Sequence, residues 1–230
     1  MPLPTLETPK YTLTLPSTKQ KIEYRPFLVK EEKILLLAQQ SEDSDTIFRA
    51  MIDIVDACTF NRLLIDKLSN VDLEFIFLKL RARSVGETVD LNVFCDKCEE
   101  PNQITIDIDD IKVKYSRKKV DPTIQLTEDI GVVCTYPTVK ALMRVKRDNP
   151  SEIISCVIES IYDSETTYNL EDETPEEINK FIDTLNMKQL SKIQEFIQSV
   201  PKIQHTVKFE CSKCNHKNSK LIQGAESFFA

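Results

Sequence analysis

The sequence is poor in glycine and histidine, and these shortages exclude several classes of enzyme. Its three glycines, Gly86, Gly131 and Gly224, are isolated from one another. A phosphate-binding P-loop or a dinucleotide-binding fingerprint needs clustered glycines, so the chain contains neither motif. Two histidines, His205 and His216, form no zinc-protease helix motif, and a Gly-x-Ser-x-Gly elbow is also missing. The sequence therefore predicts no active site of these kinds, and we expect a non-enzymatic protein.

Long hydrophobic runs are missing too. The longest aliphatic run, Ile34 to Ala38, is far too short to span a membrane. The first residues lack the basic-then-apolar pattern of a signal peptide, which predicts a protein that stays in a cytoplasm. Apolar residues make up 41% and charged residues 29%, a balance typical of soluble globular proteins. The net charge of −7 argues against general nucleic-acid binding, which depends on lysine and arginine facing phosphates.

Cysteine, in contrast, is present in a repeated pattern. Four of the seven cysteines form two Cys-x-Lys-Cys units that begin at Cys95 and Cys211, 116 residues apart. The same shift places Asn102 on Asn218. Apolar and polar residues alternate on both sides of each unit, which predicts two β-hairpins with thiols at their tips. Without a secretion signal, such pairs favour a metal site over disulfides.

These four thiols predict a structural zinc site made of Cys95, Cys98, Cys211 and Cys214. Two residues between cysteines let both sulfurs of a unit face one ion, and four thiolates complete the tetrahedron that structural zinc prefers. Such a site is closed and stabilises the fold, by an amount on the order of 10 kcal/mol in small zinc peptides and less in a larger domain. Nearby lysines can offset its negative charge: Lys97, Lys208, Lys213 and Lys217.

Several alternatives to this site stay open. The pairs could be redox dithiols, although neither lies in a thioredoxin-like strand-to-helix context. His216 could replace one cysteine as a ligand, and four cysteines can hold iron as well as zinc. The three remaining cysteines, in apolar segments, are interpreted as buried free thiols: Cys58, Cys134 and Cys156.

Hydrophobic periodicity predicts an α+β fold in which helical segments surround a discontinuous Cys₄ zinc ribbon. Residues 1–86 are expected to form a proline-rich arm, two short strands and helices over 31–40, 44–57 and 70–84. Residues 87–137 are expected to be β-rich with the first zinc knuckle, 138–202 helical and 203–230 the second knuckle and tail, and the size of the chain predicts one compact unit. Within the helical part we expect helices over 138–147 and 150–162, an acidic linker over 163–173, and helices that start at Thr174 and Asn186.

Two further features suggest contacts with partners. The basic stretches 112–114 and 117–119 could contact nucleic acid, but a solvated loop or a patch for an acidic partner is the better interpretation, because no aromatic platform interleaves them. The C-terminal Phe228 and Phe229 either fold back onto the core or anchor a partner protein.

The chain resembles the baseplate hub proteins of T-even-type contractile-tailed bacteriophages, a family of hub subunits and hub assembly proteins. The matching features are the strand from Leu13 to Pro16, the knuckle from Phe94 to Cys98, the helical middle, the knuckle from Val207 to Cys214, and the Phe-Phe ending. The resemblance implies a non-enzymatic tail morphogenesis protein, and its knuckle positions fall on the four cysteines named above.

The resemblance further implies other hub proteins as partners, with no membrane and no small-molecule substrate. It places the protein in the cytoplasm of the infected bacterium during assembly, or in the tail baseplate of the virion. One competing hypothesis is a nucleic-acid-binding zinc-ribbon protein of a phage, which predicts salt-dependent binding. Another is an enzyme with an unrecognised carboxylate site, which no sequence motif supports.

Overall fold

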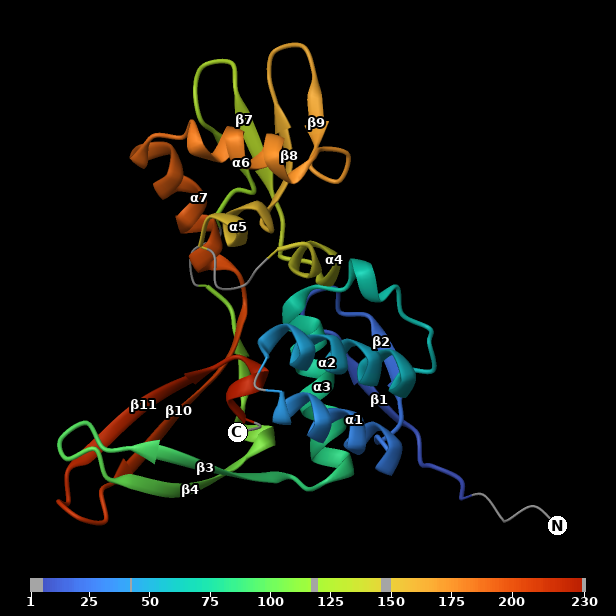
Figure 1. The fold of residues 1–230 in the computed structure, drawn as a ribbon, viewed down its shortest axis with the longest axis vertical. Helices are drawn as coiled ribbons and strands as arrows, with labels where there is room; N and C mark the ends of the chain where they lie inside the picture. The colour runs from blue at the N-terminus through green and yellow to red at the C-terminus, as the bar shows by residue number, and fades with distance from the viewer. Residues whose placement is uncertain (1–5, 42, 117–119, 146–149, 229–230) are drawn as a thin grey trace. The chain divides into compact units, whose positions relative to one another are not determined.

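The computed structural model describes residues 6–41, 43–116, 120–145 and 150–228, and it mixes helices with β-sheets as the sequence predicts (Figure 1). Contacts within the chain divide it into two compact units. The first unit comprises residues 1–63, 71–114 and 202–230, and the second comprises residues 64–70 and 115–201. The four-part division expected from the sequence stays a prediction. Among the described helices, none is both long and apolar enough to cross a membrane.

Three helices lie together in the first unit, beside a short hairpin (Figure 1). They are α1 (Val29–Gln40), α2 (Ser44–Cys58) and α3 (Asn70–Ser84), and the hairpin pairs β1 (Tyr11–Thr14) with β2 (Lys21–Tyr24). All five elements were expected from periodicity. Helix α2 buries Met51, Ile54 and Val55 on one side, as its apolar spacing predicts. Asp43, rather than Ser44 or Asp45, caps α2, because its side chain accepts a hydrogen bond from the Thr46 backbone.

Two further hairpins in the first unit carry the repeated cysteine units. One pairs β3 (Thr88–Phe94) with β4 (Pro101–Asp107), and the other pairs β10 (Lys202–Glu210) with β11 (Lys217–Gln223). The strand-end pairs next to the loops are equivalent under the 116-residue shift, so the sequence repeat is also a repeat in structure. A short strand, β5 (Lys112–Lys114), extends the second hairpin. Part of the predicted basic loop is therefore β-structure, and residues 117–119 lie outside the described residues.

The second unit is built on a four-stranded antiparallel sheet. Its order is β6 (Thr123–Gln125), β7 (Gly131–Cys134), β8 (Ile158–Tyr162) and β9 (Thr167–Asn169). The helices of this unit are α4 (Val139–Met143), α5 (Pro150–Ser155), α6 (Pro175–Asp183) and α7 (Met187–Ser199). Val132, Ile158, Ile193 and Phe196 lie at the centre of its core. Helices α6 and α7 begin with capping boxes at Thr174 and Asn186, as predicted.

The expectation of a helical segment over residues 138–202 is wrong in its middle. The helix expected over 150–162 ends at Ser155, and β8 follows it; the expected acidic linker contains β9. Isoleucines at 154, 158 and 161 fit a helical spacing, but Ile158 and Ser160 are buried while Glu159 is exposed, which is the alternation of a strand. Pairing of β8 with β7 and β9 satisfies its backbone and overrides the local pattern.

The C-terminal segment folds back onto the first unit. A short 3₁₀ helix runs over Ala225–Phe228, and the Phe228 side chain is 0% exposed. The Ala225 backbone also donates a hydrogen bond to Glu74 of α3. The first of the two alternatives for the Phe-Phe ending therefore holds for Phe228, whereas Phe229 lies outside the described residues.

Candidate metal centre

The two hairpin tips of the first unit bring the four repeated cysteines together. The sulfur of Cys98 lies 3.4 Å from that of Cys214 and 3.6 Å from that of Cys211, and the Cys95 sulfur lies 3.7 Å from that of Cys214. All four sulfurs lie within 4.8 Å of one another. A tetrahedral ion with metal–sulfur bonds of about 2.3 Å requires sulfurs about 3.8 Å apart. The four side chains could therefore hold one metal ion.

The two knuckles have the same backbone geometry. The Cys95 N–H donates to the carbonyl of Glu100 at 3.0 Å, and the equivalent Cys211 N–H donates to the carbonyl of His216 at 2.9 Å. Glu99 and Asn215, also equivalent, both adopt the left-handed conformation, with φ of 56° and 53°. This tight turn aims both thiols of a unit toward the same point, which is why two intervening residues suffice.

Each knuckle is also held by an asparagine from the other hairpin. Asn102 of β4 accepts a hydrogen bond from the Ser212 backbone at 2.9 Å, and Asn218 of β11 accepts one from the Asp96 backbone at 2.9 Å. The Asn102 amide group lies 3.8 Å from the sulfur of Cys211. Both asparagines are buried. The sequence repeat aligns these asparagines, but nothing in the sequence pattern indicates their contacts with the opposite knuckle.

Hydrogen bonds around the sulfurs favour thiolates at two positions. Burial opposes ionisation of Cys95, but hydrogen bonds from the backbone N–H groups of Lys97 and Cys98 and from Asn218 outweigh it and lower the Cys95 pKa to about 6. The backbone N–H of Cys214 is the largest cause of the lowered pKa of Cys211. Both buried thiols are thus prepared to act as anionic ligands.

Cys98 behaves in the opposite way. The backbone N–H of Glu100 favours its thiolate, but burial and hydrogen bonds shared with the other three sulfurs raise the Cys98 pKa to about 12. Four thiolates this close repel one another, so without a cation some of them keep their protons. A divalent cation would replace those protons, and the donor set of four sulfurs fits a soft or borderline metal such as zinc.

Ion pairs connect the two knuckles at the surface. Lys213 donates to Glu100 at 2.7 Å, and Lys220 donates to Asp96. The pKa of Lys213 is raised, first by its hydrogen bond with Glu100. Lys213 had been expected to offset the charge of the sulfurs, whereas Lys220 had not been singled out. Both lysines therefore link the hairpins to each other through carboxylates.

The other candidate ligands lie elsewhere. Cys58, Cys134 and Cys156 are buried, as predicted, and form no disulfide within the part of the chain that the structure describes. The ring of His216 is not part of the sulfur cluster, and its carbonyl accepts hydrogen bonds from the Cys211 backbone and the Asn218 side chain instead. Within the described residues, the four cysteines form the one group of three or more Cys, His, Asp or Glu side chains gathered closely enough for a metal.

Comparison with known proteins identifies a family for this chain. The model of the family described as T4 bacteriophage base plate protein matches residues 8–230, nearly the whole chain. No curated protein and no solved structure matches. The family match indicates a structural role in the phage tail baseplate, in association with other baseplate proteins. The chain therefore belongs to the T4 bacteriophage base plate protein family.

Proposed function

We propose that this protein is a non-enzymatic component or assembly factor of the baseplate central hub, held together by one structural zinc ion. Family membership over residues 8–230 supports the baseplate part. The approach of four sulfurs to within 4.8 Å of one another is the single observation that supports the metal part. The hub assignment extends the family match through the knuckle sequences and the Phe-Phe ending named above.

Cys95, Cys98, Cys211 and Cys214 would hold the zinc ion, which would supply the positive charge that four thiolates require. Because all four positions are protein ligands, such a site has no place for water or substrate, and its role is mechanical. It joins two hairpins that are 116 residues apart in sequence and so fixes the C-terminal hairpin to the middle of the chain. A fixed arrangement of hairpins suits a subunit that must fit between neighbouring proteins.

The first experiment is elemental analysis of the purified, reduced chain beside a Cys95→Ser variant, with Cys134→Ala as the matched control. About one zinc per chain, lost in Cys95→Ser and kept in Cys134→Ala, is the expected result. Iron in place of zinc would keep the site but change its metal. An absence of metal in the reduced parent chain would refute the metal part of the proposal.

The hub assignment is tested separately by mass spectrometry of purified virions and of assembly intermediates from infected cells. Detection with hub proteins in both samples indicates a permanent subunit, and detection in intermediates alone indicates an assembly factor that leaves. Association confined to peripheral baseplate proteins would refute the hub assignment while keeping the family membership. Assembly intermediates form in the cytoplasm of the infected bacterium under this proposal.

The competing function, a nucleic-acid-binding zinc ribbon, has a specific signature. Binding to DNA or RNA would weaken strongly as salt rises, because released counterions drive such binding. The net charge of −7 disfavours it. A gel-shift series at rising salt with the metal-loaded chain distinguishes the two functions.

A further inference from the structure

Helix α1 is oriented against the usual rule for a surface helix. Its inner side buries a carboxylate, since Glu31 is 2% exposed, together with Leu35 and Ala38. Its outer side exposes aliphatic residues instead, with Val29 72% and Leu37 68% exposed. An ordinary surface helix buries its apolar stripe and exposes its charges. Two questions follow: which contacts hold α1 in this orientation, and what its exposed aliphatic side binds.

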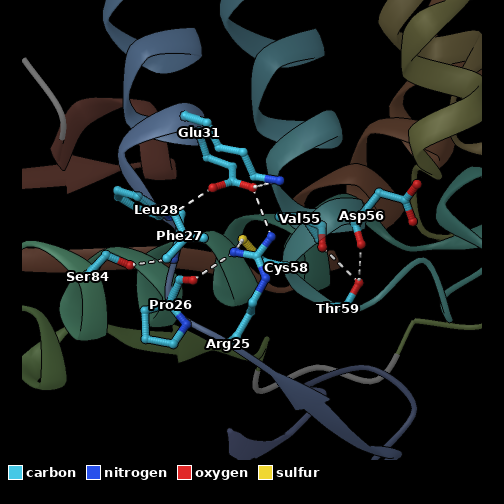
Figure 2. A network of polar contacts seen from close by, with 11 residues as sticks. Arg25, Pro26, Phe27, Leu28, Glu31, Val55, Asp56, Cys58, Thr59 and Ser84 are labelled. Carbon is cyan, nitrogen blue, oxygen red and sulfur yellow. Dashed lines mark hydrogen bonds and ion pairs between the residues drawn. The ribbon is translucent and has the colours of Figure 1, made fainter. Parts of the chain in front are cut away.

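The cause is a buried polar network at the start of α1 (Figure 2). One oxygen of Glu31 accepts a hydrogen bond from the guanidinium of Arg25 at 2.8 Å, and the other accepts one from the Leu28 backbone at 2.8 Å. The guanidinium also donates to the Pro26 carbonyl at 3.0 Å and lies 3.6 Å from the sulfur of Cys58 in α2. These contacts attach Glu31 to residues before α1 and to the end of α2.

The segment before α1 is attached to α3 as well. The Phe27 backbone donates to the hydroxyl of Ser84 at 2.9 Å (Figure 2). The Arg25 backbone donates to the Cys58 carbonyl at 3.0 Å. Rotation of α1 to bury its outer aliphatic residues would move the Glu31 carboxylate away from its hydrogen-bond partners. Arg25 would then lose its ion-pair partner. Leaving one partner of a buried ion pair alone is strongly destabilising, so the network fixes the rotation of the helix.

We name the exposed side the outer face of α1 and define it by six residues: Val29, Lys30, Lys33, Ile34, Leu36 and Leu37. They form two adjacent ridges of a helix, Val29–Lys33–Leu36 and Lys30–Ile34–Leu37, at spacings of three and four residues. All six are exposed. Ridges of this spacing pack into the grooves of a second helix, so the geometry fits a helix more closely than an extended strand.

The charges on this face are of one sign. Lys30 lies 3.4 Å from Glu31, but that carboxylate already accepts a hydrogen bond from Arg25, so two cations share one anion. Lys33 has no ion pair with any of the described residues, and Glu32 is half-buried with Arg81 among the charges near it. The outer face thus presents aliphatic side chains and surplus positive charge on a chain whose net charge is −7.

We propose that the outer face of α1 is a docking surface for an amphipathic helix of another baseplate protein. That helix would present aliphatic side chains to Ile34, Leu36 and Leu37, and carboxylates to Lys30 and Lys33. Charge complementarity selects such an acidic partner and fixes its register. The proposal rests on the association with other baseplate proteins that the family membership indicates. It is independent of the zinc ion and of the hub assignment.

The alternatives fit the face less well. A second copy would bring four lysines together at the interface without an exposed carboxylate from either outer face. Residues 1–5, the first segment outside the described residues, contain no acidic side chain. A membrane surface would attract the lysines, but membrane-bound helices of this kind commonly carry a larger basic face than two residues.

Photo-crosslinking in the full chain tests the proposal. The photoreactive residue p-benzoylphenylalanine is placed at Leu37, and the chain is produced together with the complete set of baseplate proteins of the same phage. The same probe at Leu64, which is exposed in the second unit, is the matched control. We expect the probe at Leu37 to crosslink to an acidic, aliphatic helical segment of another baseplate protein, and the probe at Leu64 not to reach that segment.

Two variants test the chemistry of the contact. Lys30→Glu combined with Lys33→Glu should reduce the crosslink roughly tenfold or more, and so should Leu36→Asp. Thermal melting should stay unchanged for Leu36→Asp and for Lys33→Glu alone, because both residues are exposed, whereas Lys30 lies 3.4 Å from the buried carboxylate of Glu31. Lysines introduced at the crosslinked acidic positions of the partner should restore the crosslink to the double Lys→Glu variant. Recovery of this kind is specific to a charge-paired interface.

Several results of these experiments would overturn the proposal. A different occupant would be assigned to the face if Leu37 crosslinked to a second copy of the chain or to the chain's own N-terminal segment. The same would follow if the purified chain bound phosphatidylglycerol vesicles and the combined Lys30→Glu and Lys33→Glu changes abolished that binding. No crosslink from Leu37 in assemblies that contain the chain would also overturn the proposal. A crosslink that persists undiminished in the charge-reversed variant would refute the acidic chemistry of the partner.

Discussion

Asn102 and Asn218 occupy equivalent places in the two cysteine hairpins, and each hydrogen-bonds to the opposite knuckle as well as to a carbonyl of its own knuckle. Asn218 accepts from the Asp96 backbone at 2.9 Å, and its amide group lies 3.6 Å from the sulfur of Cys95. Asn102 does the same for the Ser212 backbone and Cys211. The two hairpins are therefore joined by the side chains of these asparagines, in addition to any metal ion that the four sulfurs hold. Each asparagine also orients one buried thiol.

Removing these asparagines is expected to weaken metal binding without removing a ligand. Asn102→Ala and Asn218→Ala should each lower metal affinity about 10–100-fold, because groups that hydrogen-bond to metal ligands orient them and tune their basicity. Competition with a chromophoric chelator measures the affinity. Asn92→Ala, an exposed position on β3, is the control and should bind metal like the parent chain. Equal affinities in all variants would mean that the asparagines act on the hairpins alone.

Metal removal is expected to destabilise the first unit. A strong chelator, or Cys211→Ser, should lower the melting temperature by several degrees or more, because a change of 1 kcal/mol shifts the midpoint of a chain this size by about 2–4 °C. Differential scanning calorimetry with and without added zinc measures the shift. Cys156→Ala should keep its response to chelator, since Cys156 lies outside the sulfur cluster. A melting curve indifferent to chelator in the parent chain would contradict a structural metal.

Burial of Phe228 predicts that the C-terminus contributes to the core. Phe228→Ala should cost about 3–5 kcal/mol of unfolding free energy, because truncating a fully buried aromatic side chain loses its transfer energy and leaves a cavity. Urea unfolding measures this loss. Phe94→Ala, with a ring that is 59% exposed, is the control and should change stability far less. A small effect at Phe228 would show that the tail detaches readily.

The cluster of four cysteines is the part of the structure most accessible from sequence. Two Cys-x-Lys-Cys units with matching flanks predict two hairpins, and equal spacing predicts equal knuckles, as the backbone contacts of Cys95 and Cys211 confirm. The roles of Asn102 and Asn218 were hidden, although the repeat aligns them. Each contacts a residue more than 100 positions away, so no local pattern reports the crossing of the two hairpins.

Other features were decided by tertiary contacts that a local pattern does not contain. Strand β8 carries isoleucines that fit helix and strand alike, and only its neighbours β7 and β9 select the strand. Glu31 lies in a run of charged residues, Lys30 to Lys33, that suggests an exposed turn of helix, and its burial follows from Arg25 six residues earlier. Periodicity therefore predicted the existence of α1 but not which side of it faces the core.

The buried pair of Arg25 and Glu31 predicts a stability that depends on pH. Burial opposes ionisation of Glu31, but hydrogen bonds from Arg25 and the Leu28 backbone outweigh it, and the pKa of Glu31 is lowered in the folded chain. A group with a lowered folded pKa contributes its full stability above its unfolded pKa, about 4.3, and loses it as the pH falls through the folded pKa. The contribution of Glu31 should therefore be complete at pH 7 and decline in acid.

Glu31→Gln tests this dependence directly, because glutamine keeps the shape of the side chain and removes the charge. At pH 7 the variant should be less stable than the parent by about 3–5 kcal/mol, since it leaves the Arg25 guanidinium buried without its carboxylate. Urea unfolding at pH 7 and near pH 3 should show the difference shrinking in acid, as the parent's own carboxylate becomes protonated. Glu23→Gln is the control: its partner Arg62 is exposed, and an exposed pair is worth about 1 kcal/mol or less. A difference for Glu31→Gln that stayed constant between the two pH values would mean that packing, rather than the ion pair, makes Glu31 important for holding α1 in its orientation.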